Sequence, residues 1–348
     1  MKILISAAKT GGHVFPAISV GSELIKQGHE VVFLGSGAKL ELNALKDIDF
    51  TFYKVSMEGF RGKSVFQKIK SLFLLPLCIF KSMQIIRKEK VDGMIGFGGF
   101  ITVPAGIASF LMQKPLFIHE QNSVMGSANR FLSKLTKLNF TGFVIDSAPK
   151  NSIVTGNPIR DSFNSTYKNY IDSNDIINIY VTGGSQGADY INQNVPKCFN
   201  NLNKKINIKH QCGSRKIDAV REAYKNTKVK VEVKEFYENP ESIINWSDFV
   251  ITRSGALSIS EISSMAKGML MIPLPSAIDN HQYINAKHIE SMNMGVIHNE
   301  KNGLKDLVAK VSEIIYQKTY NDWKIEINTD HKNAASVISA KTIEHLNK

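Results

Sequence analysis

Two glycine-rich segments of this chain have the residue types that bind phosphate. Thr10-Gly11-Gly12-His13 follows the apolar run Lys2–Ala7, and Gly183-Gly184-Ser185-Gln186-Gly187 follows the run Ile176–Thr182. Such a turn between a strand and a helix offers several backbone N–H groups to an anion, so both segments are candidate diphosphate sites. The alternative is a tight turn that needs glycine only for a positive φ.

Three further positions could take part in proton transfer or charge neutralisation. His13 could accept a proton from a hydroxyl near neutral pH, or it could cap the following helix. His119-Glu120-Gln121-Asn122 follows the apolar run Pro115–Ile118. Open α/β sheets bind ligands at this end of a strand, although a solvated loop would look similar. Arg160, after Asn157-Pro158, could neutralise a departing diphosphate through two parallel hydrogen bonds.

Two polar segments in the second half could bind the rest of a nucleotide sugar. Arg253-Ser254-Gly255-Ala256 has the form of another strand-to-helix turn, and Glu261 beyond it could accept hydrogen bonds from a ribose. A solvated helical carboxylate is the alternative for Glu261. Asp279-Asn280-His281-Gln282, with Asn285, suits the hydroxyls of a sugar.

Several enzyme classes are disfavoured by their missing motifs. Gly96-Phe97-Gly98-Gly99-Phe100 has Ile101 where the sixth residue of GxGxxG would be glycine, and GxxxxGK[ST] does not occur. Asp47-Ile48-Asp49 imitates a metal-binding DxD, but no strongly apolar strand leads directly into it. We therefore expect neither a metal nor a cofactor. The three cysteines (Cys78, Cys198 and Cys212) lie far apart, which favours a reducing compartment.

The elements that must position these residues form two similar halves. In each, an apolar run leads through a glycine-rich turn into a helical pattern, from about Pro16 to Gln27 and from about Tyr190 to Asn201. This indicates two doubly wound α/β domains with a boundary near Gly156-Asn157-Pro158. A last helix over Ala334–Leu346 could pack back across that boundary. Further strands are expected at Val31–Leu34, Gly93–Ile95, Leu116–Ile118, Asn207–Gln211, Lys230–Val233, Phe249–Thr252 and Leu270–Ile272.

The net charge of +12 is concentrated in the first half. Residues 1–160 hold 20 Lys and Arg against 10 Asp and Glu, and the stretch Arg61–Lys90 holds eight against one. An anionic membrane, nucleic acid or a phosphorylated partner would be attracted. Four apolar residues at spacings of four, three and three share a helical face there, which favours a membrane surface over packing on the sheet. These residues are Phe73, Leu77, Phe80 and Met83.

Together, these segments resemble the MurG family, the UDP-N-acetylglucosamine transferases that convert lipid I to lipid II in cell-wall synthesis. The matching segments cover nearly the whole chain, and their joint occurrence is more specific than any one of them. In order, they are Thr10-Gly11-Gly12-His13-Val14-Phe15-Pro16-Ala17, Arg61-Gly62-Lys63, Gly96-Phe97-Gly98-Gly99-Phe100, His119-Glu120-Gln121-Asn122, Gly156-Asn157-Pro158-Ile159-Arg160, Gly183–Ala188, Arg253–Glu261 and Asp279–Asn285.

The resemblance implies a GT-B fold, two Rossmann-like doubly wound domains facing each other across a cleft. It also implies an inverting, metal-independent transfer. Residues 1–158 would receive lipid I and associate with the membrane, and residues 159–330 would bind UDP-GlcNAc. Residues 331–348 would form a C-terminal helix that could pack on the first domain. The enzyme would lie on the cytoplasmic face of the cell membrane as a peripheral protein, with other cell-wall synthesis proteins as further partners and no nucleic acid.

The same resemblance implies roles for individual residues. His13 would be the base for the muramyl 4-hydroxyl, with Glu120 as runner-up, and Arg160 would steady the leaving UDP. Gln282 and Asn122 would contact the GlcNAc hydroxyls. The diphosphate of lipid I would bind at Thr10, Gly11, Gly12, Gly98 and Gly99. The residues expected to contact UDP-GlcNAc are Thr10, Gly11, Gly12, Asn122, Arg160, Ser185, Ala256, Leu257, Ser258, Ile259, Ser260, Glu261 and Gln282, with Glu261 on the ribose.

Some positions depart from the family pattern, and other functions stay open. Ala8 and Lys9 stand where two glycines are usual, Phe100 replaces a tyrosine, and His281 stands where a glutamine is common. The nearest alternative is a GT-B transferase acting on another lipid, such as diacylglycerol. A UDP-GlcNAc 2-epimerase shares the fold but should lack the basic apolar helix. A non-catalytic, membrane-bound UDP-sugar sensor is the alternative from another class.

Overall fold

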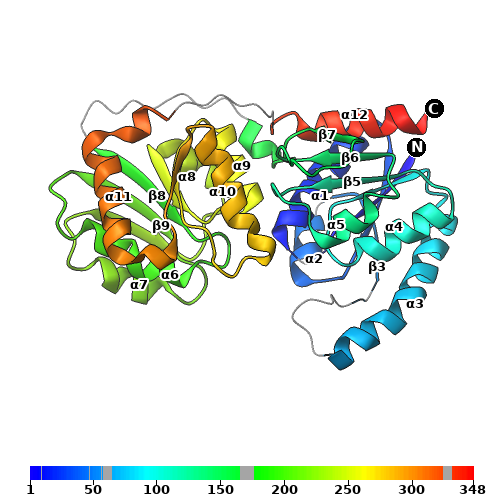
Figure 1. The fold of residues 1–348 in the computed structure, drawn as a ribbon, viewed down its shortest axis with the longest axis horizontal. Coiled ribbons are helices and arrows are strands. Elements are labelled where there is room, and N and C mark those ends of the chain that lie inside the picture. The colour runs from blue at the N-terminus through cyan, green and yellow to red at the C-terminus, as the bar shows by residue number, and fades with distance from the viewer. Residues whose placement is uncertain (9, 47, 56, 58–64, 165–175, 324–330) are drawn as a thin grey trace. The chain divides into compact units, whose positions relative to one another are not determined.

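The computed structural model describes residues 1–8, 10–46, 48–55, 57, 65–164, 176–323 and 331–348. The chain divides into two compact units. Unit 1 comprises Met1–Asp161 together with Thr329–Lys348, and unit 2 comprises Ser162–Asn328 (Figure 1). Lys9, Asp47 and the segment Arg61-Gly62-Lys63 lie outside the described residues.

The described part of unit 1 is built on a seven-stranded parallel sheet in the order β3-β2-β1-β4-β5-β6-β7. The chain begins in the middle of the sheet, adds strands to one edge, and then crosses to the other side of β1. This is the strand order of a doubly wound, Rossmann-like fold. The strands are β1 (Lys2–Ser6), β2 (Glu30–Gly35), β3 (Thr51–Lys54), β4 (Gly93–Gly96), β5 (Leu116–Glu120), β6 (Leu138–Thr141) and β7 (Ser152–Val154).

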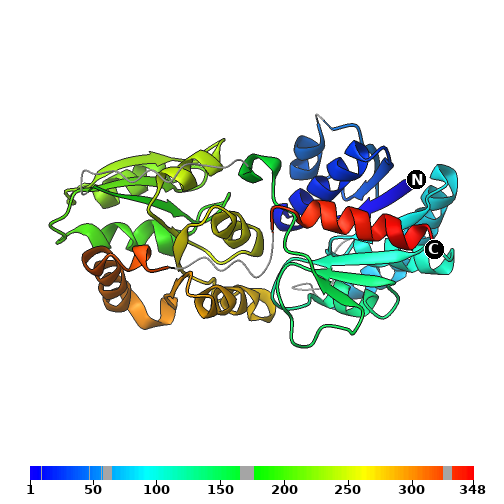
Figure 2. The ribbon, with the colours of Figure 1, turned by 90° about the horizontal axis from the view of Figure 1, so that it is seen from above.

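Helices cover both faces of the unit 1 sheet because its strands are apolar on both sides. In β1, Ile3 and Ile5 pack with residues of α1 and α12, whereas Leu4 packs with residues of α3, α4 and α5. Figure 2 shows α12 beside α1 on the first of these faces. The helices are α1 (Gly11–Lys26), α2 (Lys39–Leu45), α3 (Val65–Glu89), α4 (Thr102–Leu111), α5 (Ser127–Leu132) and α12 (Ala334–Leu346).

The described part of unit 2 repeats this plan with a six-stranded parallel sheet, ordered β10-β9-β8-β11-β12-β13. Alternate residues of its central strands again face opposite layers. Ile179, Val181 and Leu270 pack towards α6, α7 and α11. Val250 and Met269, each next to a residue of that cluster along its strand, are fully buried on the opposite face of the sheet. The strands are β8 (Ile177–Thr182), β9 (Ile206–Gln211), β10 (Lys230–Lys234), β11 (Phe249–Thr252), β12 (Gly268–Met271) and β13 (Gly295–Ile297).

The remaining unit 2 elements are helices of varied length. The longer ones are α6 (Asp189–Asn194), α7 (Ile217–Tyr224), α8 (Pro240–Trp246), α9 (Ala256–Ser264), α10 (His281–Ser291) and α11 (Gly303–Gln317). Short 3-10 turns are η2 (Pro196–Phe199), η3 (Ile278–Asn280), η4 (Glu300–Asn302) and η5 (Thr319–Asn321), and η1 (Asp161–Asn164) lies at the unit boundary.

Two helix predictions are corrected by the structure. The first helix begins at Gly11 rather than near Pro16, because the N–H groups of His13 and Val14 both donate to the Thr10 carbonyl, at 3.1 Å. The glycine segment is thus the first turn of the helix. The helix expected over Tyr190–Asn201 is divided into α6 and η2 at Pro196, which lacks the N–H that would continue it.

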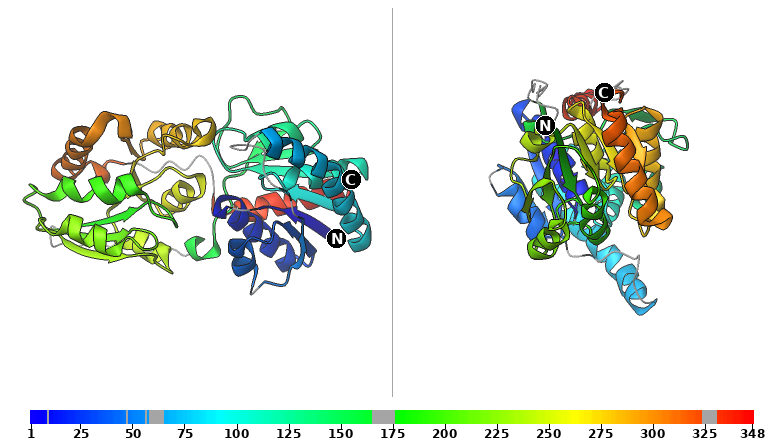
Figure 3. Two further views of the ribbon diagram at one scale, coloured as in Figure 1. Left: turned by 90° about the horizontal axis from the view of Figure 1, so that it is seen from below. Right: turned by 90° about the vertical axis from the view of Figure 1, so that its left-hand side faces the viewer.

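Helix α3 projects beyond the rest of unit 1 in two views (Figures 1 and 3). Phe73, Leu77 and Phe80 are 76%, 65% and 60% exposed, whereas Met83 is partly buried against the core. The side chains of residues 65–72, including the basic residues at 68 and 70, lie outside the described part. Within that described part, no helix is long and apolar enough to cross a membrane.

Candidate functional site

Both glycine-rich turns lie where the strand order of their sheet reverses. In unit 1 the turn follows β1, and the neighbouring strand β4 leads into a second glycine-rich segment of this unit, Gly96–Phe100. In unit 2 the turn follows β8, and the neighbouring strand β11 ends in the segment Arg253–Ala256. The loops after two such strands diverge to opposite faces and leave a crevice, which is where open α/β sheets bind ligands.

His13 lies between the two glycine segments of unit 1. Its Nδ1 is 3.0 Å from the Thr10 hydroxyl. Gly98 and Gly99 have φ values of +91° and +82°, and a Cβ added at Gly98 would lie 3.1 Å from His13 Nε2. If Nδ1–H donates to Thr10, the ring presents its basic lone pair at Nε2, beside Gly98. The structure thus brings together the predicted base and the predicted diphosphate glycines.

Glu120 is buried and its carboxylate is held by four N–H groups. One oxygen accepts from the backbone and side-chain nitrogens of Asn122, both at 3.1 Å, and the other accepts from Gly126 N and Asn129 Nδ2, both at 2.9 Å. The side chain is 3% exposed. A carboxylate whose lone pairs are engaged in this way organises the loop between β5 and α5. This geometry favours His13 over Glu120 as the base.

His119 is fully buried beneath the same loop. The Gly156 carbonyl, 3.0 Å from Nε2, can only accept, so Nε2 carries the proton and Nδ1 accepts from Gln121 Nε2 at 3.1 Å. Burial lowers the pKa of His119 to about 4, although its bond to the Gly156 carbonyl opposes this shift. His119 is therefore neutral at pH 7 and joins β5 to the Gly156-Asn157-Pro158 segment.

Arg160 and Asn122 are both partly exposed in unit 1. The Arg160 guanidinium lies over the ring of Phe15, 5.7 Å from its centroid, on the helix that carries His13. The backbone before it is fixed, since the Asn157 N–H donates to His331 Nδ1 at 2.9 Å and Asn157 Nδ2 donates to the Gln121 carbonyl at 3.0 Å. Asn122 donates its side-chain N–H to Glu120 at 3.1 Å.

One position of the glycine-rich turn in unit 2, Gly187, can be occupied only by glycine. Gly187 has φ +69°, and a Cβ added there would lie 1.9 Å from the Cys212 carbonyl oxygen. Gly184 has φ +81°, and its N–H donates to the Thr182 hydroxyl at 3.0 Å. Ser185 at the tip is exposed. The Gly184 and Gly187 N–H groups both bond within the turn, the latter to the Gly184 carbonyl at 3.1 Å, so the exposed tip residues Ser185 and Gln186 are the ones placed to meet an anion.

Gln211 is a supporting residue of this turn that the sequence did not reveal. Its Nε2 donates to the Gly184 carbonyl at 3.0 Å, and its Oε1 accepts from Tyr237 N at 3.1 Å. Gln211 ends β9, the strand beside β8. Its position at the carboxyl end of a predicted strand was the available signal.

The predicted nucleoside segment forms the first part of α9. Ile259 and Ser260 are fully buried, so their side chains face the protein interior, while Leu257 and Ser258 are partly exposed. Ala256 and Glu261 are 7% exposed. The Glu261 side chain, predicted to accept from a ribose, is thus almost entirely buried.

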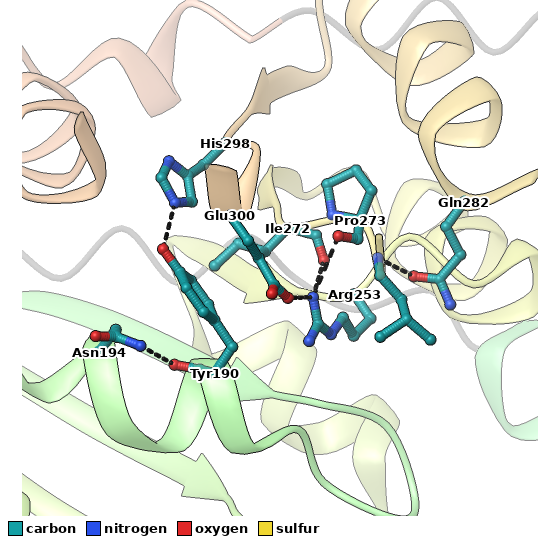
Figure 4. Close-up of polar contacts among 9 residues, drawn as sticks. Tyr190, Asn194, Arg253, Ile272, Pro273, Gln282, His298 and Glu300 are labelled. Carbon is teal, nitrogen blue, oxygen red and sulfur yellow. Dashed lines mark hydrogen bonds and ion pairs between the residues drawn. The ribbon is translucent and has the colours of Figure 1, made fainter. Parts of the chain in front are cut away.

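Gln282 and Arg253 belong to one polar cluster at the carboxyl end of the unit 2 sheet (Figure 4). Gln282 Oε1 accepts from Leu274 N at 2.9 Å, and Arg253 Nη1 lies 2.6 Å from Glu300 Oε1. Asn285 is fully buried, and its Nδ2 donates to the Ser254 carbonyl at 3.1 Å. Asn285 therefore anchors α10 to the turn after β11.

A second unpredicted group connects α6 to α11. His298 follows β13 and is fully buried, with Nδ1 2.7 Å from Asp306 Oδ2 and Nε2 2.9 Å from the Tyr190 hydroxyl. Its ring also stacks on Tyr190, with centroids 5.9 Å apart. Burial raises the pKa of Tyr190, and the nearby Glu300 carboxylate acts in the same direction. The three residues are up to 116 positions apart in sequence, so no local sequence pattern predicts that they lie together.

Comparison with known proteins assigns the fold and the family. The glycosyltransferase family 28 N-terminal domain matches residues 3–140, and the C-terminal domain of that family matches residues 178–340. The crystal structure of Acinetobacter baumannii MurG superposes with a TM-score of 0.84 at 27% identity, covering 99% of both chains. UDP-GlcNAc 2-epimerase from Neisseria meningitidis, at 15% identity and a TM-score of 0.68, shares the GT-B fold alone.

Curated relatives carry one enzyme name. The UDP-N-acetylglucosamine--N-acetylmuramyl-(pentapeptide) pyrophosphoryl-undecaprenol N-acetylglucosamine transferase of Vesicomyosocius okutanii is 38% identical, over 99% of this chain and 96% of its own. The enzyme of the same name from Acinetobacter baumannii is 33% identical, over 82% of this chain and 81% of its own. The chain therefore belongs to the MurG family of glycosyltransferases.

Proposed function

We infer that this protein transfers GlcNAc from UDP-GlcNAc to the muramyl 4-hydroxyl of lipid I and so forms lipid II. The observation that carries this inference is the 38% identity to a transferase of that name over almost the whole chain. The two units support it, since each presents a glycine-rich turn at the switch point of its sheet. A reaction between two phosphate-bearing substrates needs two such sites.

The donor is assigned to unit 2. The tip of the Gly183–Gly187 turn, with the Ser185 hydroxyl, would bind the diphosphate of UDP. The first residues of α9 would contact the nucleoside, with Glu261 accepting from the ribose. Gln282 would contact the hydroxyls of GlcNAc, and Asn122 and the Thr10–Gly12 segment of unit 1 would also contact the donor.

The acceptor is assigned to unit 1, with its diphosphate at Thr10–Gly12 and Gly98–Gly99. His13 Nε2 would take the proton of the muramyl 4-hydroxyl as its oxygen forms a bond to C1 of GlcNAc. The bond from C1 to the UDP oxygen breaks at the same time, so the configuration at C1 is inverted. Arg160 would neutralise the charge that develops on the leaving UDP.

The protein would bind lipid I at a membrane surface. Three exposed apolar side chains, Phe73, Leu77 and Phe80, lie on the helix that projects from unit 1. Lys81 on the same helix, also exposed, adds positive charge near them. An apolar stripe with basic residues suits peripheral binding to the anionic cytoplasmic leaflet. Other proteins of cell-wall synthesis would be partners at that surface.

The test is transfer with purified lipid I and UDP-GlcNAc, followed by detection of the disaccharide lipid. His13→Ala should lose transfer while the protein still binds UDP, because the diphosphate and nucleoside of UDP are assigned to unit 2 and His13 lies in unit 1. Absence of the disaccharide product with the unaltered protein would refute the assignment. Full biological activity of His13→Ala would instead support a non-catalytic sensor.

A further inference from the structure

Arg253 is a largely buried charge to which the proposed reaction gives no role. It follows β11, and its side chain is only 12% exposed. The Nη1 nitrogen donates to the carbonyls of Ile272 and Pro273 at 2.9 and 3.3 Å and contacts Glu300 Oε1 at 2.6 Å (Figure 4). A guanidinium that is buried to this extent needs such partners.

These partners come from the ends of adjacent strands. Ile272 and Pro273 follow β12, Glu300 follows β13, and the sheet places β11, β12 and β13 side by side. The Arg253 guanidinium therefore links three loops at the carboxyl end of the sheet. Its rigid, planar donor group suits this task better than a lysine ammonium would.

The next residue along the chain connects this link to Gln282. Leu274 N, adjacent to Pro273, lies 2.9 Å from the Gln282 side-chain amide. A backbone N–H can only donate, so the amide atom that faces it is Oε1. The Gln282 amide consequently presents its Nε2 group away from Leu274 (Figure 4). In this orientation the two N–H groups of Nε2 can donate to the oxygen of a ligand hydroxyl, while the Leu274 N–H occupies one lone pair of Oε1.

We propose that Arg253, paired with Glu300, is a positioning residue for recognition of the donor sugar. It fixes the Pro273–Leu274 backbone, and that backbone sets which end of the Gln282 amide faces the ligand. This inference rests on the proposed function, because it takes Gln282 to be a sugar contact. Arg253 itself touches neither the sugar nor the reacting atoms.

The effect should be confined to the sugar because α10 has a separate anchor. Asn285, one turn after Gln282, donates to the Ser254 carbonyl at 3.1 Å, a hydrogen bond in which the Arg253 side chain takes no part. Loosening of Pro273–Leu274 would therefore free the Gln282 amide to rotate while the helix stays in place. The glycine-rich turn after β8 has its own support in Gln211. UDP alone, which lacks the sugar, should not sense the change.

The experiment compares the Kd values of UDP and UDP-GlcNAc by titration calorimetry, which needs no acceptor. In Arg253→Lys, the Kd for UDP-GlcNAc should rise about tenfold, as expected for loss of an oriented hydrogen bond, while the Kd for UDP changes less than about twofold. Lys287→Ala removes an exposed ion pair from the same helix, α10, and should change neither value.

A double-mutant cycle separates positioning from general support. Gln282→Glu keeps an oxygen for Leu274 N but removes the N–H donors, so it should also weaken UDP-GlcNAc selectively. If Arg253 acts through Gln282, the double variant should bind UDP-GlcNAc no more weakly than the worse single variant. Additive losses would overturn the proposal. So would an equal weakening of UDP and UDP-GlcNAc in Arg253→Lys.

A milder variant covers the case in which Arg253→Lys does not fold. Glu300→Gln keeps an acceptor oxygen for Nη1 and removes only the charge, so the same selective loss should appear at about threefold. Equal effects on the two ligands would again overturn the proposal. An unaltered protein that binds UDP but not UDP-GlcNAc would refute the proposed donor itself, which is a different result from loss of selectivity in the variants.

Discussion

Replacing Glu120 by glutamine tests whether this buried carboxyl is a structural group or the catalytic base. The carboxylate accepts four N–H groups, two at each oxygen, from Asn122, Gly126 and Asn129. A glutamine has one carbonyl oxygen and an NH₂ group, so one pair of these donors would face another donor. Glu120→Gln should therefore lose two hydrogen bonds in a site that is closed to water.

The expected loss of stability in Glu120→Gln is large because the acceptor, a carboxylate, is charged. A hydrogen bond to a charged group contributes roughly 1.5–3 kcal/mol, so two of them give about 3 kcal/mol as the smaller figure. For a domain the size of unit 1, each kcal/mol lowers Tm by about 2–4 °C. The unit 1 transition should thus fall by about 6–12 °C.

Differential scanning calorimetry with and without UDP is the suitable assay. UDP should raise only the transition of the unit that binds it, so the unresponsive transition reports unit 1. Tryptophan fluorescence would miss the effect, because Trp246 and Trp323 both belong to unit 2. If the unit 1 Tm of Glu120→Gln is unchanged while transfer is abolished, the structural reading is refuted and Glu120 becomes the base.

Three other predictions concern the rest of the molecule. The pKa of His119 is lowered to about 4, so the unfolded state binds more protons than the folded state between pH 4 and pH 6.5. The stability of unit 1 should therefore fall by up to about 3 kcal/mol as the pH falls through this window. Calorimetry that shows no change there would contradict this prediction. Gly187→Ala should raise the Kd for UDP more than tenfold, since its Cβ would lie 1.9 Å from a carbonyl oxygen; unchanged titrations would disprove the role of the turn. Phe73→Asp with Phe80→Asp should abolish sedimentation with anionic vesicles, whereas Leu42→Asp, at another exposed apolar residue, should not; equal binding by all variants would exclude the stripe.

Local sequence patterns predicted the central elements of both units well. The apolar runs before the glycine segments form β1 and β8, and the pattern over Ala334–Leu346 matches the bounds of α12. These elements are specified by short-range periodicity and by glycine. The short strands β7 and β13, of three residues each, carry too little pattern to be recognised.

The chemistry of the polar residues was harder to predict because it depends on tertiary packing. His119 and Glu120 read as ligand groups at a strand end, but both are buried. His119 bonds to Gly156, far along the chain, and Glu120 bonds to the loop that follows its own strand. Arg253 read as part of a turn, and its contact with Glu300 depends on the order of three strands. The sequence shows that such polar residues stand at unusual positions, but only the fold shows which neighbours form hydrogen bonds and ion pairs with them.

The chain order of the two units has a consequence for synthesis. Unit 2 is an insertion within unit 1, whose last element, α12, places the fully buried Ile338 in one core cluster with Ala17 and Leu24 of α1. A ribosome therefore releases all of unit 2 before it releases the helix that covers that face. Domains generally fold in the order in which they emerge. Here we expect the second unit to complete its fold first, while the nascent first unit keeps an apolar surface exposed until α12 has been synthesised.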